Sequence, residues 1–299
     1  MIKIKNVSKA FGEVKAVNQI TLTIQNGLVF GMLGTNGAGK STLLRMMAGV
    51  LKPDSGQIYV DGEPVWDNPS AKSKFFYISD DQFYYPNATP SDLISFYKNF
   101  YPAFDESRFL EFLKSFGLDY NRKINTFSKG MKKQISILLG ICSNASYIFC
   151  DETFDGLDPV MRQAIKSLFA KEIEEKGLTP IIASHSLREL EDICDHIGLL
   201  HKGGVLLSKE LEDLKCNLTK VQCVLPPESD EYLEHNLNIL KKQRRGKLLT
   251  MTVRGKEEEI EAKIQQLEPI YYESLPLTLE EIFISETEVV GYDMQTLIV

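Results

Sequence analysis

The stretch Gly34-Thr35-Asn36-Gly37-Ala38-Gly39-Lys40-Ser41-Thr42 decides the fold of the chain. It fits the pattern G-x-x-x-x-G-K-[ST] and lies between an apolar run, Leu28–Leu33, and a helical pattern from Lys40 to Val50. The three glycines let consecutive backbone N–H groups point inward, and the helix that follows adds its positive N-terminal end. The stretch therefore predicts a phosphate-binding loop in which Lys40 contacts phosphates and Ser41 ligates Mg²⁺.

Two further apolar runs end in polar residues of catalytic type. Tyr147–Cys150 precedes Asp151 and Glu152, and Pro180–Ala183 leads to His185. Such runs are typical of central strands in a parallel sheet that is covered on both faces. We expect Asp151 to hold Mg²⁺ through water, Glu152 to orient or deprotonate an attacking water, and His185 to donate to a γ-phosphate opposite Lys40.

The rest of the chain divides into recognisable segments. Short strands are expected early in the chain and again around Lys202–Gly203, where the pattern indicates a hairpin. These strands are Ile2–Val7, Ile20–Ile24, Gln57–Val60, Ile197–Leu200 and Gly204–Leu207. Helical periodicity from Ser91 to Ser143 predicts an inserted helical subdomain, at about residues 88–143. After Lys215 the alternation of apolar and polar residues becomes weaker and runs of charged residues appear. This change predicts a first domain over 1–215 and a small α+β domain over 216–299.

Composition narrows the functional classes. The 299 residues carry 34 basic and 41 acidic side chains, a net charge of −7. Residues 1–220 hold 26 of each sign, so the whole net charge lies in residues 221–299. A neutral body with an acidic tail disfavours a nucleic-acid partner, which would usually need a basic patch.

Cysteine usage and hydropathy indicate a reducing compartment. The five cysteines are scattered without C-x-x-C spacing, which is typical of reduced thiols buried as small hydrophobic side chains. They are Cys142, Cys150, Cys194, Cys216 and Cys223. No stretch approaches the roughly 20 apolar residues needed to cross a bilayer, and the first residues do not resemble a targeting segment.

The order of the motifs resembles the ATPase subunits of ABC transporters over residues 1 to about 215. The phosphate loop, Phe127-Ser128-Lys129-Gly130-Met131, the Asp151–Glu152 pair, Gly156-Leu-Asp158-Pro159 and Ser184–His185 follow one another as in that family. The resemblance implies an α/β phosphate-loop fold with a mixed sheet core, an inserted helical subdomain and an accessory C-terminal domain. The end of the chain, including Pro276–Ile284, is similar to ATPases of bacterial drug, bacteriocin and lantibiotic exporters.

The resemblance also implies roles for individual residues. Phe11 resembles the aromatic residue that stacks on adenine. Ser128 and the Gly130 N–H would contact an ATP held by the loop of a second subunit, so that two ATP molecules lie between the subunits. Asp158 looks like the residue that crosses the dimer axis, although a carboxylate there would also suit a helix N-terminus.

The sequence departs from the family pattern in three motifs. Lys129 and Met131 stand where L-S-G-G-Q has Gly and Gln. The family has a loop with a glutamine that approaches the metal, and the segment Tyr77–Pro86 corresponds to this glutamine loop. An ungapped alignment places Asp80 at the glutamine position and Gln82 two residues later, and either could approach the metal. A carboxylate there would ligate Mg²⁺ but repel the γ-phosphate, which predicts slower or more tightly gated hydrolysis. Thr153 stands where the family usually has proline or another small residue.

An unusual density of aromatic residues follows. Eleven rings lie between Phe75 and Phe104. In the family, the segment after the glutamine loop receives a short helix from the membrane subunit, which suggests a docking role for the cluster from Phe83 to Phe104. About half of these rings are expected in the core instead, because a helical subdomain needs one.

The sequence thus predicts an ATP-hydrolysing subunit, with ATP and Mg²⁺, that powers transport through separate transmembrane permease subunits at the cytoplasmic face of the membrane. Export is the expected direction, and the dimer is formed either with itself or with a related ATPase. Two alternatives remain open at this point. One is a nucleotide-gated regulatory subunit with negligible hydrolysis, and the other is an ABC ATPase without a membrane partner.

Overall fold

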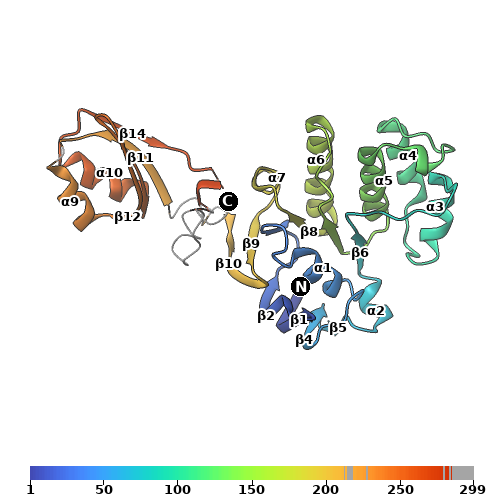
Figure 1. The fold of residues 1–299 in the computed structure, drawn as a ribbon. Coiled ribbons are helices and arrows are strands. Elements are labelled where there is room, and N and C mark those ends of the chain that lie inside the picture. The colour runs from blue at the N-terminus through green and yellow to red at the C-terminus, as the bar shows by residue number, and fades with distance from the viewer. Residues whose placement is uncertain (212, 214–217, 227, 279, 283, 285–299) are drawn as a thin grey trace. The chain divides into compact units, whose positions relative to one another are not determined.

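A computed structural model describes residues 1–211, 213, 218–226, 228–278, 280–282 and 284. Contacts between residues divide the chain into two compact units, Met1–Ser208 and Lys209–Val299, and each is described by itself (Figure 1). The domain boundary expected at residue 215, Cys216, and two positions within Pro276–Ile284, residues 279 and 283, fall outside the described residues.

An antiparallel sheet opens the first unit, with strand order β2-β1-β4-β5. Its strands are β1 (Ile2–Phe11), β2 (Val14–Ile24), β4 (Ser55–Val60) and β5 (Glu63–Pro64). A two-residue turn joins β1 to β2, and Gly12 adopts there a φ of 60°, which glycine reaches without steric cost. Apolar side chains on one face of β1 and β2 are buried, so this sheet covers one side of the core.

A second sheet of six strands, in the order β10-β9-β3-β8-β7-β6, places the polar motifs. Its members are β3 (Phe30–Leu33), β6 (Phe75–Ile78), β7 (Tyr147–Asp151), β8 (Thr179–Ser184), β9 (His196–His201) and β10 (Gly204–Glu210). The five strands from β9 to β6 run parallel. Because carboxyl ends of parallel strands meet at one edge, the segments after β3, β7 and β8 come together.

Strand β6 lies within the aromatic stretch that the sequence singled out. Phe75 and Phe76 are buried, and the Phe75 ring stacks on Phe149 of β7, with ring centroids 4.8 Å apart. Aromatic side chains suit both strands and helix cores, so periodicity alone did not predict this strand. The start of the aromatic stretch is therefore sheet core.

Helices complete the first unit (Figure 1). They are α1 (Lys40–Met47), α2 (Pro69–Lys72), α6 (Pro159–Lys176) and α7 (Leu187–Glu191). Helix α1 packs on β7 and β8, and α7 packs on β8 and β3. Helix α1 ends before the predicted Val50, which follows a glycine with a φ of 59°. One core of buried side chains joins both sheets and α1, including Ile4, Met32, Leu43 and Phe149.

A helical subdomain is inserted between β6 and β7. It contains α3 (Pro90–Lys98), α4 (Glu106–Ser115), the 3₁₀ turn η1 (Ile124–Thr126) and α5 (Lys129–Cys142). Its helices begin at polar caps: Thr89 and Asp92 form a capping box on α3, and Asp105 accepts from the Arg108 N–H on α4. Helix α5 begins at Ser128, so the signature pentapeptide forms a helix N-terminus.

The second unit is a four-stranded antiparallel sheet with helices on one face. The sheet order is β12-β13-β11-β14. Its elements are β11 (Leu218–Val224), α9 (Ser229–Asn236), β12 (Asn238–Arg245), β13 (Leu248–Arg254), α10 (Glu257–Gln265) and β14 (Tyr271–Leu275). Alternate residues of β11 and β13 pack with Leu233 of α9 and Ile264 of α10 in a separate core. The opposite face of the sheet carries polar side chains.

Candidate nucleotide site

The glycine-rich loop connects β3 to α1, as the sequence predicts. Gly39 precedes α1 with a φ of 102°, and a Cβ built on it would lie 2.2 Å from the Ala16 carbonyl oxygen. At Gly34 a Cβ would lie 2.6 Å from the Leu200 carbonyl oxygen. Backbone conformation and close packing therefore require glycine at position 39, and close packing alone requires it at position 34. The loop is fixed by its neighbours rather than free to adapt.

Lys40 lies inside this loop and is only 5% exposed. Its Nζ donates to the carbonyl oxygens of Gly34, at 2.8 Å, and of Thr35, at 3.3 Å. The same nitrogen lies 3.4 Å from Glu152 Oε1. A buried ammonium is stable only when paired, and the loop carbonyls with Glu152 satisfy it here. Lys40 is thus held at the place where anionic phosphates would enter.

Ser41 and Asp151 form a hard-oxygen pair beside the loop. Ser41 Oγ donates to Asp151 Oδ1 at 2.7 Å, and the Tyr77 hydroxyl donates to Oδ2 at 3.3 Å. Burial raises the pKa of the Asp151 carboxyl, while the hydrogen bond from Ser41 and the nearby Arg45 charge oppose that rise. One carboxylate and one hydroxyl, with substrate phosphates and water completing the shell, fit the octahedral preference of Mg²⁺. The residues present therefore fit this ion.

Glu152 follows β7 in a left-handed backbone conformation with a φ of 48°, which is uncommon for a residue other than glycine. Its N–H donates to the Ala183 carbonyl oxygen at 3.0 Å. The carboxylate lies between two nitrogens, Lys40 Nζ and His185 Nδ1, the second 2.8 Å from Oε2. Strained backbone of this kind persists where the surroundings fix it, which is common at functional sites.

These groups surround one open cavity of about 530 Å³. Most residues that the sequence assigned to nucleotide binding and catalysis line it. They are Phe11, Asn36, Gly37, Ala38, Gly39, Lys40, Ser41, Thr42, Asp80, Glu152 and His185. Val14, Ala16 and Asp155 line it as well and were not predicted. The Phe11 ring is 52% exposed, as a stacking platform for a base requires.

The two candidates of the glutamine loop lie in different places. Asp80 lines the cavity, and its Oδ1 is 3.7 Å from Lys133 Nζ. The Gln82 amide nitrogen is buried without a hydrogen-bond partner among the described residues. Within the described chain, the carboxylate rather than the amide faces the nucleotide cavity.

Ser128, Gly130 and Asp158 do not line the cavity of their own chain. Ser128 Oγ accepts from the Met131 N–H at 3.2 Å, and Asp158 accepts from the Met161 N–H at 2.9 Å, so both cap helices. A Cβ on Gly130 would meet no atom closer than 3.6 Å. The fold of one chain therefore does not require glycine at 130.

Lys133 of α5 is a site residue that sequence reasoning missed. It is 7% exposed, and its Nζ donates to the carbonyl oxygens of Glu152, at 2.6 Å, and Asp155, at 2.9 Å. Together with Asp80, these contacts join α5, the segment after β7 and the glutamine loop through one cation. The sequence offers little to single it out, because two lysines, Lys132 and Lys133, follow the signature and no local pattern distinguishes them.

A phosphate loop, a serine–aspartate pair and a glutamate between lysine and histidine at one sheet edge define a nucleoside triphosphatase site. The ABC transporter family model matches residues 17–155. The chain is 30% identical over 287 residues to the ABC transporter ATP-binding protein YtrB of Bacillus subtilis (strain 168), covering 96% of this chain and 98% of that one. The chain therefore belongs to the ATP-binding proteins of ABC transporters.

Other relatives and solved structures support the same family assignment. The bacitracin transport ATP-binding protein BcrA of Bacillus licheniformis is 30% identical, with 72% of this chain and 71% of BcrA covered. The dimeric post-hydrolysis state of the ATP-binding cassette MJ0796, bound to ADP and Pi, superposes with a TM-score of 0.63 at 26% identity, over 71% and 99% of the two chains. The predicted fold class is confirmed, and the chain is an ATPase subunit that powers transport through membrane partners. No helix of the described residues is both long and apolar enough to span a membrane.

Proposed function

We propose that this chain drives export as a dimer, docked on separate permease subunits at the cytoplasmic face of the membrane. The observation that carries the catalytic part is the Glu152 carboxylate held between Lys40 and His185 at the mouth of the cavity. A carboxylate fixed in this way can orient the water that attacks the γ-phosphate and accept its proton. Lys40 and His185 would offset the charge that develops on the phosphoryl oxygens.

The phosphate loop binds the nucleotide and aligns it for in-line attack. Backbone N–H groups of Asn36–Thr42 and the start of α1 would contact the β- and γ-phosphates, and Phe11 would stack on the base. Mg²⁺ held by Ser41 and Asp151 would neutralise charge between those phosphates. Asp80, facing the same cavity, would ligate the ion or repel the γ-phosphate, so we expect slower turnover than with an amide there.

A second subunit would complete each site. Ser128, Gly130 and Asp158 lie at helix N-termini outside the cavity of their own chain, so any nucleotide that they contact belongs to another chain. The ATP-binding cassette MJ0796, with which this chain shares its fold, is dimeric in its solved structures. Two copies of this chain, or this chain and a related ATPase, would then bind two ATP molecules between them.

Docking to the permease would use an exposed aromatic stripe on the helical subdomain. Four of the eight rings between Phe83 and Phe104 are exposed and contact one another in sequence, with centroids 5.1–5.8 Å apart. They are Phe83, Tyr85, Phe96 and Phe100. Contiguous exposed aromatic surface is typical of protein interaction sites, and a short amphipathic helix would fit it. The similarity to BcrA, a bacitracin transport protein, favours an exporter permease as the partner.

Glu152→Gln tests the composite site. The amide keeps the size of the side chain but cannot accept the proton of water, so ATP binds without being hydrolysed. We expect size-exclusion chromatography with ATP and Mg²⁺ to show a dimer for this variant and a monomer without nucleotide. A Glu152→Gln protein that stays monomeric at saturating ATP would contradict the dimer.

The docking role is tested by replacing two exposed rings. Phe83→Ser with Phe100→Ser should leave ATP binding by the purified chain unchanged and should lower the share of the chain found in the membrane fraction of cells that express the permease. Ile270→Ser, which removes an equally exposed apolar side chain from the second unit, is the matched control. Equal membrane association of both variants would contradict docking through the stripe.

A further inference from the structure

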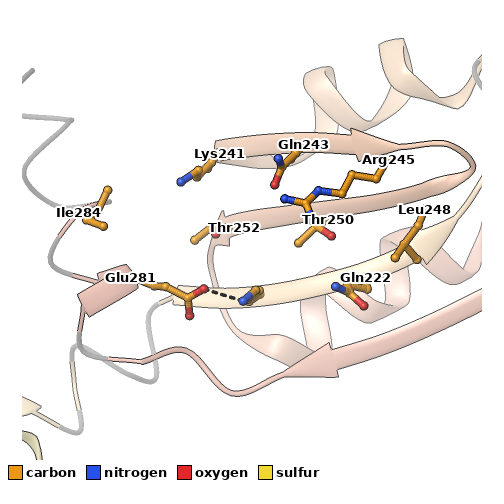
Figure 2. A pocket seen from close by; sticks show the side chains of 10 residues that line it. Gln222, Lys241, Gln243, Arg245, Leu248, Thr250, Thr252, Glu281 and Ile284 are labelled. Carbon is orange, nitrogen blue, oxygen red and sulfur yellow. Dashed lines mark hydrogen bonds and ion pairs between the residues drawn. The ribbon is translucent and has the colours of Figure 1, made fainter. Parts of the chain in front are cut away.

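The outer face of the C-terminal sheet holds a concave pocket that the nucleotide chemistry does not use. Its volume is about 280 Å³, and it lies over β12, β13 and β11 with Glu281 and Ile284 at one end (Figure 2). Water occupies about 30 Å³ per molecule in the liquid, so the pocket has room for a small organic molecule. The helices α9 and α10 pack on the opposite face of the sheet.

Strand register sets the side chains of this pocket in rows. Gln243, Thr250 and Gln222 are direct neighbours across three strands, and Lys241, Thr252 and Lys220 form the next row. Neighbouring strands lie about 4.8 Å apart, so the first row offers two amides around a hydroxyl and the second row two ammonium groups around a hydroxyl, close enough for one small ligand to contact neighbouring side chains of a row. The row of two amides around a hydroxyl can both donate to and accept from a polar ligand.

The cations of β12 differ according to the face on which they lie. Lys242 and Arg244 point to the helical side, where they pair with Asp230 of α9 at 3.2 and 2.6 Å. Lys241 and Arg245 alternate with them on the pocket side, and neither has an ion-pair partner among the described residues. Because side chains alternate between the two faces of a strand, the cations with carboxylate partners lie on the helical face. The cations without a partner among the described residues lie on the pocket face.

The described residues that line the pocket carry an excess of positive charge. Lys220 is compensated by Glu281, with Nζ 2.5 Å from Oε1. Lys241 and Arg245 remain, on either side of Gln243, and the Arg245 side chain runs back along β12 toward Gln243 and Thr250 (Figure 2). A guanidinium offers paired N–H donors that match carboxylate or phosphate oxygens. Leu248 and Ile284 are the two apolar side chains among its lining residues.

We propose that this pocket binds a small organic oxyanion, a carboxylate or a phosphate ester with hydroxyl groups on its body. Arg245 and Lys241 bind the oxyanion, and the Gln243–Thr250–Gln222 row binds the hydroxyl groups. The site is separate from the nucleotide cavity, since all of its lining residues belong to the second unit.

Isothermal titration of the full chain with three related probes tests the proposal. Glycerate and glycerol 3-phosphate carry the two anionic groups on the same kind of body, and glycerol lacks the charge. We expect saturable binding of at least one anion and none of glycerol, and the tighter anion identifies the preferred group. Failure of both anions to bind, or equal binding of glycerol, would overturn the proposal.

Variants separate a built site from general charge attraction. Arg245→Gln and Lys241→Gln should each weaken anion binding about tenfold, as expected for the loss of one charge-assisted contact. Lys247→Gln is the matched control, because it removes the same charge from an exposed turn residue outside the pocket. Equal weakening by Lys247→Gln would show diffuse attraction only and would refute the site.

The amide–hydroxyl row is tested by Thr250→Val, which keeps the branched side chain suited to a strand. We expect it to weaken glycerate or glycerol 3-phosphate binding several-fold with no change in the far-UV circular dichroism spectrum. Unchanged affinity in this variant would contradict the role of the row. Thermal unfolding of each variant, measured without ligand, distinguishes lost contacts from lost folding.

Discussion

The nucleotide cavity and the sheet pocket of the second unit both present cations to an anion, but they hold them differently. Lys40 is buried, and its ammonium group is fixed by two loop carbonyls and Glu152. Arg245 and Lys241 are exposed and lack an ion-pair partner among the described residues. The first site is preorganised for one phosphate geometry, whereas the second can adapt to ligands of different shape.

The comparison also shows why only one of the two sites has a sequence motif. In the cavity, Gly39 and Gly34 are required because backbone atoms approach within the reach of a Cβ. In the pocket, position depends on strand register between residues far apart in sequence, such as Gln222 and Thr250. Backbone constraints restrict residue types at fixed spacing, and register does not.

We expect the largest effect from a substitution that disrupts the preorganised nucleotide site. Gly39→Ala places a Cβ 2.2 Å from the Ala16 carbonyl oxygen at a φ of 102°, so the loop must move. We expect ATP binding to be lost and the free energy of unfolding to fall by about 1–3 kcal/mol. Equilibrium titration with a fluorescent ATP analogue and urea unfolding measure the two effects.

Anion binding in the second unit should be unaffected by Gly39→Ala, because no lining residue of that pocket lies in the first unit. A loss of both activities would contradict the independence of the two sites.

Substitution of Lys133 tests whether its ammonium group positions the catalytic carboxylate of Glu152. Lys133→Met leaves the carbonyl oxygens of Glu152 and Asp155 without their donor and Asp80 without its cation. We expect kcat to fall about 100-fold, because small displacements of a catalytic group carry such costs, while KM for ATP changes less than threefold.

Lys133→Gln retains a donor for one carbonyl and should recover part of the lost kcat. A purely structural lysine would give a lower thermal unfolding temperature with kcat and KM unchanged. That result would remove Lys133 from the catalytic account.

Gly130→Ala separates the demands of the fold from those of the dimer. The added Cβ meets no atom closer than 3.6 Å and lies in a helix, so thermal stability should stay the same or rise slightly. If Gly130 approaches a nucleotide in a second subunit, ATP turnover should fall about tenfold. Normal turnover, measured by phosphate release, would argue against a close approach at this position.

The smallest expected effect concerns the partnered face of β12. Burial raises the pKa of the Asp230 carboxyl, but hydrogen bonds from Lys242 and Arg244 outweigh it and hold the pKa below its ordinary value. A lowered folded-state pKa stabilises the fold above the unfolded pKa of about 3.9, and the contribution disappears as pH falls through the folded value.

Asp230→Asn should therefore cost less than about 1 kcal/mol at pH 7, as is usual for partly exposed ion pairs. Below the lowered folded-state pKa, where the wild-type carboxyl is protonated in both states, the variant and wild type should unfold at the same denaturant concentration. A difference that persists at low pH would mean that packing, not charge, accounts for Asp230.

Much of the nucleotide site could be predicted from the sequence, because its residues follow strands whose ends meet at one edge. Ser41 was assigned from the phosphate-loop pattern, and Asp151, Glu152 and His185 were assigned from their positions after apolar runs. The structure brings all four together. The parallel sheet itself was expected from those runs, although β6 was hidden in the aromatic stretch.

The remaining features depend on contacts that no local pattern encodes. Lys133 lies in a run of basic residues, and only the packing of α5 against the segment after β7 selects it over Lys132. The choice of Asp80 over Gln82 as the cavity residue likewise depends on the path of the chain after β6. Sheet register in the second unit is equally non-local, which is why its pocket was not anticipated.

The central claim is that Glu152 performs catalysis in sites shared by two chains. Steady-state ATP turnover by the purified chain with Mg²⁺, measured over a wide range of protein concentration, tests it most directly. The account predicts turnover that rises more steeply than linearly with concentration and is lost in Glu152→Gln. Turnover strictly proportional to concentration across the range, or turnover that persists in Glu152→Gln, would contradict it.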